Sequence, residues 1–210
     1  MIGENIPSED QQAFNRLLIH LLEELNLPYA IGGSIAAMRY SETRYTRDID
    51  IMFQTDRAGL AQLIESVEAL QVYIDPLETV LEYNLPGKLP VSIVDGGTGL
   101  KADLYVAQGG GLDLSAMSRR RQLSLYKDPP MDAWFLAPEN VILYKLDYFK
   151  QSDGASQKHP IDIAKMLAVV GDELDLPYLE HWAAELGVLE LWGALWDEFH
   201  RPPQIIRAKL

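Results

Sequence analysis

Three acidic residues are the parts of this 210-residue sequence with the clearest chemical potential. Asp48 and Asp50 lie in Asp-Ile-Asp-Ile-Met-Phe (48–53), whose alternation predicts a strand. Residues two apart on a strand point to the same face, so the two carboxylates would lie about 7 Å apart and repel each other unless a cation lies between them. A pair of divalent metal ions would relieve this repulsion, and oxygen-only ligands favour Mg²⁺ or Mn²⁺. From these residues alone, two solvated aspartates at a sheet edge remain the alternative.

A glycine-rich turn precedes this strand. Tyr29-Ala30-Ile31 is typical of a short buried strand, and the pattern becomes helical again from Ser34. Between them, Gly32 and Gly33 would let the backbone approach a ligand closely, and a helix start offers free N–H groups to a phosphate. The alternative is a plain turn with Ser34 as the helix N-cap.

A third carboxylate, Asp103, lies in the alternating segment Lys-Ala-Asp-Leu-Tyr (101–105). On a strand next to Asp48 and Asp50, it would complete a metal-binding cradle. By itself it would be an ordinary surface aspartate. The preceding Asp-Gly-Gly-Thr-Gly (95–99) predicts a hairpin turn; it is not a phosphate-binding P-loop, because no Ser or Thr follows the lysine.

Together these elements resemble the nucleotidyltransferase superfamily, whose fold is shared with DNA polymerase β. The resemblance covers about residues 28–106. Further along, the segments 138–146 and 158–163 look like helices of the abortive-infection type IV toxin branch, which includes many uncharacterised stand-alone bacterial proteins. Lys145 and Asp162 match that branch, whereas His159 stands where the branch has an acidic residue.

The resemblance implies an α+β fold, with a mixed sheet flanked by helices and followed by a helical C-terminal subdomain. It implies a metal-dependent enzyme that moves a nucleoside monophosphate from an NTP to a hydroxyl by a two-metal mechanism. The catalytic residues and metal ligands would be Asp48, Asp50 and Asp103, with Asp103 nearest the attacking hydroxyl and the best candidate for a general base. The nucleotide would be bound by Gly32, Gly33, Ser34, Arg47 and Lys145.

The basic residues each have a second interpretation. Arg47 could contact a phosphate or the acceptor, but a structural salt bridge is the interpretation we favour. Lys145 could neutralise triphosphate charge or could be a solvated lysine on a helix. The run Arg119-Arg120-Arg121 could meet a nucleotide acceptor, although such runs are more often a solvated helix face.

The remaining periodicity predicts the elements around this site. Helices are expected over 9–25, 57–70, 77–84, 112–123, 138–150, 161–170, 176–186 and 188–199, and strands over 29–31, 48–53, 91–94, 100–106 and 134–136. This pattern predicts a nucleotidyltransferase domain over 1–136 and a helical subdomain over 137–210. Aromatic residues of the last helices are expected in the core, with a homodimer surface if some are exposed.

Composition narrows the function further. The 18 basic and 31 acidic residues give a net charge of −13, which argues against non-specific binding of duplex DNA. The absence of cysteine excludes disulfides, thiolate zinc sites and a cysteine nucleophile. With no signal-peptide or membrane-helix pattern, we expect a cytoplasmic protein.

The acceptor stays open between tRNA, protein and a small molecule. The alternatives are a non-catalytic nucleotide-binding or protein-interaction module, such as a toxin–antitoxin component, and a metal phosphohydrolase.

Overall fold

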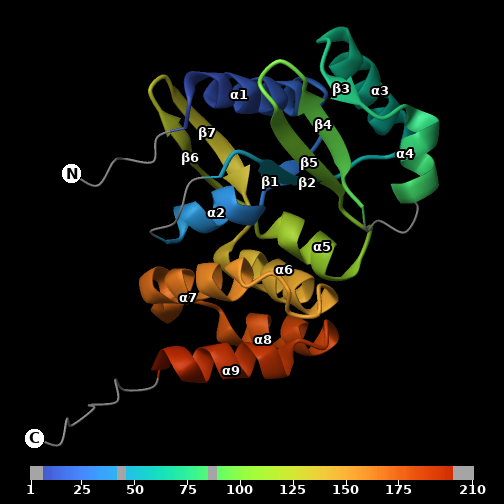
Figure 1. Ribbon diagram of the computed structural model, residues 1–210. Coiled ribbons are helices and arrows are strands. Elements are labelled where there is room, and N and C mark those ends of the chain that lie inside the picture. Colours follow the sequence, from blue (N-terminus) through green and yellow to red (C-terminus); the bar gives the residue numbers. More distant parts are fainter. Residues whose placement is uncertain (1–6, 42–45, 85–88, 201–210) are drawn as a thin grey trace, which may run out of the picture.

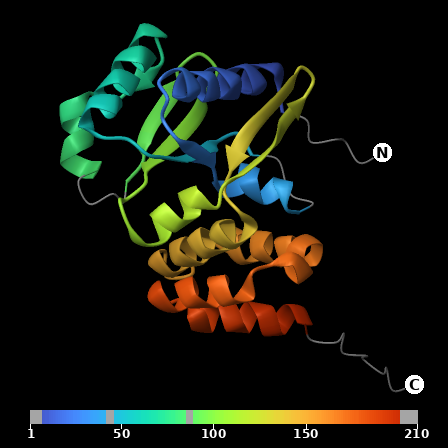
Figure 2. The same cartoon turned by 180° about the vertical axis from the view of Figure 1, so that it is seen from behind.

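The computed structural model describes residues 7–41, 46–84 and 89–200, and within them the chain forms a mixed sheet with helices on both faces (Figures 1 and 2). The strands are β1 (Tyr29–Ile31), β2 (Ile49–Phe53), β3 (Tyr73–Ile74), β4 (Val91–Asp95), β5 (Leu100–Val106), β6 (Arg121–Lys127) and β7 (Pro130–Phe135). The helices are α1 (Glu9–Glu24), α2 (Gly33–Arg39), α3 (Arg57–Ala69), α4 (Leu77–Asn84), α5 (Gly111–Ser118), α6 (Pro138–Gln151), α7 (Lys158–Val170), α8 (Leu176–Glu185) and α9 (Leu189–His200), with a 3₁₀ turn at Gly171–Glu173.

The strand order places the elements of the predicted site in the middle of the sheet. The order is β3-β4-β5-β2-β1-β7-β6. Strand β2 pairs in parallel with β5 and antiparallel with β1, and β1 pairs in parallel with β7. The strands that carry Asp50 and Asp103 are therefore neighbours, and the strand that leads into the glycine turn lies on the other side of β2.

Alternation along the central strands separates a core face from a polar face. Ile49, Ile51 and Phe53 are fully buried, and the helices α1 and α3 lie on their side of the sheet (Figures 1 and 2). The opposite face carries Asp50 and Asp103. It faces α2, α5 and a layer made of α6, α7, α8 and α9 (Figure 1). The polar face is thus the junction between the sheet and the helical layer.

The hairpin predicted before Asp103 is confirmed. Strands β4 and β5 pair antiparallel, and the turn between them is held by hydrogen bonds from the Thr98 hydroxyl and the Gly97 N–H to the Asp95 carboxylate. The pKa of Asp95 is lowered because both bonds favour the ionised form. The alternative of a P-loop at this position is therefore excluded.

One predicted helix is wrong at its C-terminal end. The helix expected over 112–123 ends at Ser118, and residues 121–127 form the edge strand β6 against β7. Leu123 and Leu125 pack inward from this strand, and Leu125 is buried, so sheet pairing overrides the local helical pattern. The predicted strand at 134–136 is accordingly the end of the longer strand β7.

The arginine run is consequently not a solvated helix face. Arg119 lies 4.0 Å from the centre of the Tyr178 ring and forms ion pairs with Asp175 at 3.2 Å and Glu139 at 3.8 Å. Arg120 lies over the Trp134 ring at 4.8 Å. These side chains are partly buried because each covers an aromatic ring. Arg119 therefore joins the segment between α5 and β6 to the helices α6 and α8.

The C-terminal helices form their own packed layer. Pro138 starts α6 as predicted, and Trp192 of α9 is buried in the core that these helices share with the sheet. The division of the chain at residues 136 and 137 and the homodimer remain predictions. Within the described residues, no helix has both the length and the apolar character needed to span a membrane.

Candidate active site

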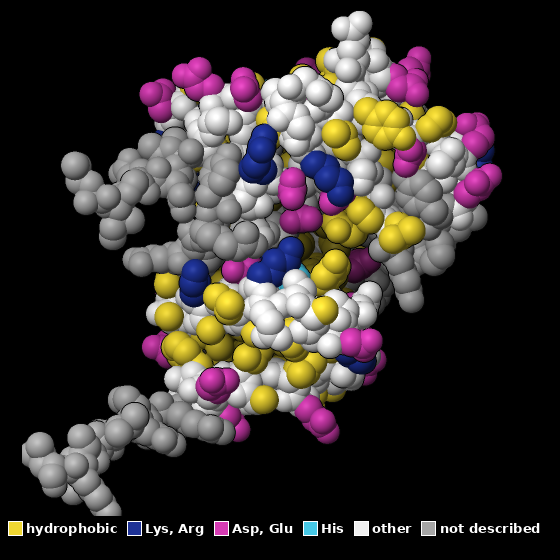
Figure 3. All heavy atoms as spheres, viewed as in Figure 1, with side chains coloured by type: hydrophobic (Ala, Val, Ile, Leu, Met, Phe, Trp, Pro, Cys, Tyr) yellow, Lys and Arg dark blue, Asp and Glu magenta, His cyan; other side chains and the backbone are white. Residues whose placement is uncertain are grey.

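Asp50 and Asp103 lie directly opposite each other on neighbouring parallel strands. The register of β2 and β5 pairs Asp50 with Asp103, and the flanking pairs place Ile49 next to Ala102 and Ile51 next to Leu104. Neighbouring strands lie about 4.8 Å apart, so the two carboxylates start from backbone positions close enough to share a ligand. In Figure 3, acidic side chains gather at the middle of the molecule, where the sheet meets the helical layer, with basic side chains nearby.

The glycine turn packs directly against Asp50. Gly32 donates its backbone N–H to the carbonyl of Asp50 at 2.8 Å. Gly33 has φ +55°, and a Cβ added at Gly33 would lie 1.8 Å from Oδ2 of Asp50. No other residue type fits there without moving the carboxylate, so glycine is required both by the backbone angle and by this close approach.

Ser34 is the second residue of α2 and is partly exposed. The N-cap of this helix is Gly32, so the alternative that Ser34 is the N-cap is wrong. The reason is that the helix begins at Gly33 itself, whose left-handed backbone only glycine adopts without strain. Ser34 therefore lies inside the first turn, next to the glycine that touches Asp50.

Asp48 lies just before β2 and is exposed. The negative charge of Asp48 nevertheless contributes to the raised pKa of Asp50. Among the residues that the structure describes, no group of three or more acidic, histidine or cysteine side chains is arranged so that it could hold a metal ion. The structure thus brings Asp50 and Asp103 together in the sheet and leaves Asp48 at the entrance to β2.

The pKa of Asp50 is raised above the value for a free aspartate. Burial is the largest cause, and the negative charges of Asp103 and Asp48 add to it. The positive charges of Lys145 and Lys158 act in the opposite direction. An additional cation at this position would therefore favour the ionised form of Asp50.

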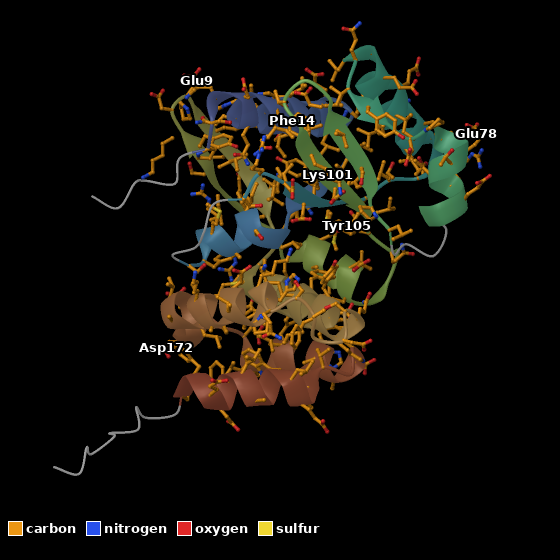
Figure 4. The ribbon with its side chains drawn as sticks, viewed as in Figure 1. Glu9, Phe14, Glu78, Lys101, Tyr105 and Asp172 are labelled. Atoms are coloured by element: carbon orange, nitrogen blue, oxygen red, sulfur yellow. The ribbon has the colours of Figure 1, made fainter. Side chains whose placement is uncertain are left out.

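Asp103 already has two partners, neither of which the sequence reasoning proposed. The Ser92 hydroxyl donates to Oδ1 at 2.6 Å, and the Lys101 ammonium lies 2.9 Å from Oδ2. Ser92 comes from β4, directly opposite Asp103 in the hairpin register. The hairpin signal in the sequence could have found this pairing, and the spacing of two residues could have placed Lys101 on the same face. Lys101 is labelled in Figure 4, where it lies along β5 together with Tyr105.

Lys145 is buried rather than solvated, so that interpretation is wrong. Its Nζ lies 2.8 Å from Oδ2 of Asp162, and the two side chains are 5% and 3% exposed. The pair links α6 to α7 beneath the polar face of the sheet. A buried lysine needs such a partner because an isolated buried charge is costly.

Arg47 is exposed beside Asp48, and its guanidinium donates to the carbonyl of Thr98 at 3.1 Å. This contact connects the start of β2 to the β4–β5 turn. Among the described residues Arg47 forms this hydrogen bond and no ion pair, so the structure does not show the salt bridge that we favoured from the sequence.

Three tyrosines that the sequence pattern did not single out lie on β5, beside the carboxylates, and on α6. Tyr105 lies on β5 two residues after Asp103, and burial together with the charges of Asp50 and Asp103 raises its pKa, so that it stays protonated. Tyr144 of α6 donates to Asp113 at 2.6 Å, with its hydroxyl also 3.8 Å from the sulfur of Met52. The exposed Tyr148 follows one turn later.

The Tyr148 ring lies 4.9 Å from the ring of His159 on α7. Tyr148 also acts electrostatically on Tyr105, so Tyr105, Tyr148 and His159 bring together side chains from the sheet and from two helices of the layer that faces it. Helical spacing relates only Tyr144 and Tyr148 of α6; no spacing relates them to Tyr105 or His159, because that proximity depends on how the helical layer docks on the sheet.

Comparison with known proteins identifies the fold. No protein-family model matches the chain, and the search of curated proteins found no match. Among solved structures, the antibiotic-resistance factor ANT(2″)-Ia is similar over 91% of this chain and 97% of that chain, with 18% identity and a TM-score of 0.56. An antigenic nucleotidyltransferase-like protein from Paracoccidioides brasiliensis is similar over 91% and 94%, with 18% identity and a TM-score of 0.53. The lincosamide antibiotic adenylyltransferase LnuA, in a lincomycin-bound structure, is similar over 77% and 98%, with 16% identity and a TM-score of 0.50.

The chain therefore has the nucleotidyltransferase fold, as the sequence pattern predicts. Placement in the toxin-like branch remains a prediction from the sequence.

Proposed function

We propose that this protein is a metal-dependent nucleotidyltransferase that transfers a nucleoside monophosphate from an NTP to a hydroxyl group of a small molecule. One observation carries this proposal: Asp50 and Asp103 are paired in register on adjacent parallel strands, with Gly33 in close contact with the Asp50 carboxylate. A purely structural strand pair gains nothing from two like charges side by side, whereas a cation site needs them.

The donor set fits a hard divalent cation. Asp50, Asp103 and Asp48 offer only oxygen ligands, which suit Mg²⁺ and Mn²⁺. Burial and the negative charges of Asp103 and Asp48 raise the pKa of Asp50, and those neighbouring negative charges would attract a cation to this position. When bound, such ions would neutralise charge on the transferred phosphate and lower the pKa of the attacking hydroxyl.

The nucleotide would lie at the glycine turn. Gly32 and Gly33 keep the backbone open beside Asp50, and the Ser34 hydroxyl lies in the same turn to donate to a phosphate oxygen. Arg47 contributes positive charge at the start of β2, from the exposed side. Lys145 contributes charge from behind Asp50, where its ammonium is held by Asp162.

The acceptor hydroxyl would approach Asp103, which orients it and accepts its proton if a base is required. Tyr105 lies near this carboxylate and the exposed Tyr148 lies near Tyr105, and the two rings would supply apolar surface for a small organic acceptor. A small molecule is also supported by the similar structures, one of which is ANT(2″)-Ia in complex with adenylyl-2″-tobramycin and another LnuA bound to lincomycin. The net charge of −13 further disfavours an extended RNA acceptor.

A second candidate is a non-catalytic nucleotide-binding module. It is favoured by one observation, namely that within the described residues the acidic side chains are not arranged as a ready-made three-residue metal site. In that case the glycine turn would bind nucleotide without transfer.

Nucleotide transfer can be tested directly. The protein, Mg²⁺ and each of the four α-labelled NTPs would be incubated in turn with a panel of polyhydroxylated small molecules, with tRNA and with protein. We expect label on a small molecule, reduced by about a hundred- to a thousandfold in Asp50→Asn, because this variant removes a carboxylate that would hold the charge-stabilising cation. Asp132→Asn is a matched control, since Asp132 is an exposed aspartate on β7 of the same sheet.

The outcomes separate the candidates. Label on tRNA or protein would exclude the small-molecule acceptor but retain the chemistry. Thermal stabilisation by NTP and Mg²⁺ without any transfer would favour the binding module. No transfer and no stabilisation by any NTP would contradict both.

A further inference from the structure

Lys101 occupies the place at Asp103 where a metal ion would be expected to bind. Its ammonium lies 2.9 Å from Oδ2 of Asp103, while the Ser92 hydroxyl takes Oδ1 at 2.6 Å. Both oxygens of this carboxylate are therefore engaged by donors. Lys101 and Asp103 are two residues apart on β5, so both side chains project from the polar face of the sheet.

The two aspartates differ in how their charge is balanced. Asp50 is half-buried against Gly33 and its pKa is raised, and the lysine whose charge acts on it most strongly, Lys145, is itself paired with Asp162. Asp103, in contrast, has a lysine in direct contact. Of the two carboxylates at the centre of the site, only Asp103 thus has a lysine of the chain as a direct counter-charge.

The Lys101 contact is built to be reversible. The Lys101 side chain is 41% exposed, whereas the Asp103 side chain is 15% exposed. The lysine can therefore swing into solvent while the carboxylate stays in place, because a long flexible side chain loses little when its charged end is rehydrated. An ion pair whose ammonium is open to solvent is held weakly, so a divalent cation can displace the ammonium.

We propose that Lys101 is an internal counter-cation that holds Asp103 in place when no metal is bound and competes with the divalent cation for Oδ2. The proposal rests on the proposed metal-dependent function and gives Lys101 a positioning role. Its consequence is that metal binding at Asp103 is an exchange, in which one positive charge leaves the carboxylate as the ion arrives. The site then avoids two adjacent uncompensated carboxylates in the metal-free protein.

The first test measures Mn²⁺ affinity without nucleotide, by electron paramagnetic resonance of free Mn²⁺ in titrations of the full chain. Lys101→Met keeps the aliphatic stem and removes the charge. We expect it to bind Mn²⁺ roughly two- to fivefold more tightly than the wild type, the range that a weak surface ion pair implies. Lys127→Met is the matched control. It removes the same charge from an exposed lysine on β6, which β2, β1 and β7 separate from β5, and we expect no change.

The second test separates displacement from simple charge repulsion in the wild-type protein. The rate at which the Lys101 amine reacts with an acylating reagent is measured by peptide mass spectrometry, with and without saturating Mn²⁺. Displacement predicts that this rate rises severalfold when the metal binds, with Lys127 as the internal reference. An unchanged rate at Lys101 would overturn the proposal even if Lys101→Met binds metal more tightly.

The proposed function and this inference fail in different ways. Mn²⁺ binding that is lost in Asp50→Asn but unchanged in Lys101→Met would overturn the role of Lys101 and leave the metal site intact. Binding of Mn²⁺ by none of the variants would overturn the metal-dependent function and, with it, the role of Lys101.

Discussion

Replacement of Gly33 by alanine is the sharpest perturbation of the proposed site. The added Cβ would lie 1.8 Å from Oδ2 of Asp50, 2.5 Å from Cγ and 2.8 Å from Cβ. All three distances are below the 3.0 Å that real Cβ contacts respect, so rotation of the carboxylate alone does not relieve the clash. The whole Asp50 side chain must withdraw from the turn, or the turn must move away from β2.

The free-energy cost has two parts. Alanine at φ +55° is in the left-handed region, which costs roughly 1–2 kcal/mol for a residue with a Cβ. For a chain of this length that corresponds to a melting temperature lower by about 2–8 °C, before any cost of the clash. The effect on activity should be larger than the effect on stability, because a catalytic group displaced by about 1 Å can lose a factor of 100 in rate.

The measurement is the transfer rate with labelled NTP at a temperature well below the melting point, together with thermal unfolding of the same samples. Gly33→Ala should lose at least about 100-fold in kcat/KM, equivalent to about 2.7 kcal/mol of transition-state stabilisation. Gly96→Ala is the control, since Gly96 lies in the β4–β5 turn with nothing within 4 Å of an added Cβ. Wild-type transfer and stability in Gly33→Ala would refute the argument that this close approach defines the site.

Three further changes test other parts of the structure. Asp50→Asn should raise the melting temperature at neutral pH, because burial and acidic neighbours disfavour the ionised form of Asp50. This gain in melting temperature should shrink as the pH falls, since native Asp50, with its raised pKa, takes up a proton before the unfolded chain does. A gain that is independent of pH would contradict this reasoning. Asp162→Asn should lower the free energy of unfolding by about 3–5 kcal/mol in urea titrations, because it leaves the buried ammonium of Lys145 without its counter-charge. If the double variant Lys145→Met/Asp162→Leu recovered none of this loss, the loss would not come from the uncompensated charge. Gly193→Ala, in the interior of α9 with open space around it, should stabilise the protein by about 0.5–1 kcal/mol and leave transfer unchanged; a loss of stability would show an unrecognised contact there.

The central part of the fold was predictable because several local signals agree there. The strand of residues 29–31, the glycine turn and the alternating strand at 48–53 each have a clear pattern, and the hairpin around Asp95–Gly99 has a recognisable turn sequence. These signals lie close together in the chain, so little tertiary information is needed to combine them. The superfamily resemblance supplied what local pattern cannot, namely that Asp103 belongs with Asp50.

Other features depended on contacts that no local pattern encodes. The first residues of strand β6 belong to a segment with a helical pattern, 112–123. The strand forms there because it pairs with β7 and buries Leu125. Arg119 looked like part of a solvated run, yet it is held by Tyr178, almost 60 residues further along the chain. Lys145 could be placed on a helix, but its burial follows from the docking of α7 through Asp162.

The proposed site is a consequence of the same alternation that builds the core. Leu100, Ala102 and Leu104 are buried on one face of β5, and this fixes the register in which Asp103 faces Asp50. A slip of one residue along β5 would turn the leucines to the polar face and bury Lys101 and Asp103 in the core. The cost of exposing those apolar side chains and burying two charged groups therefore protects the geometry of the carboxylate pair. In this arrangement the two aspartates can repel each other without separating, because the apolar face of the sheet holds their strands in place.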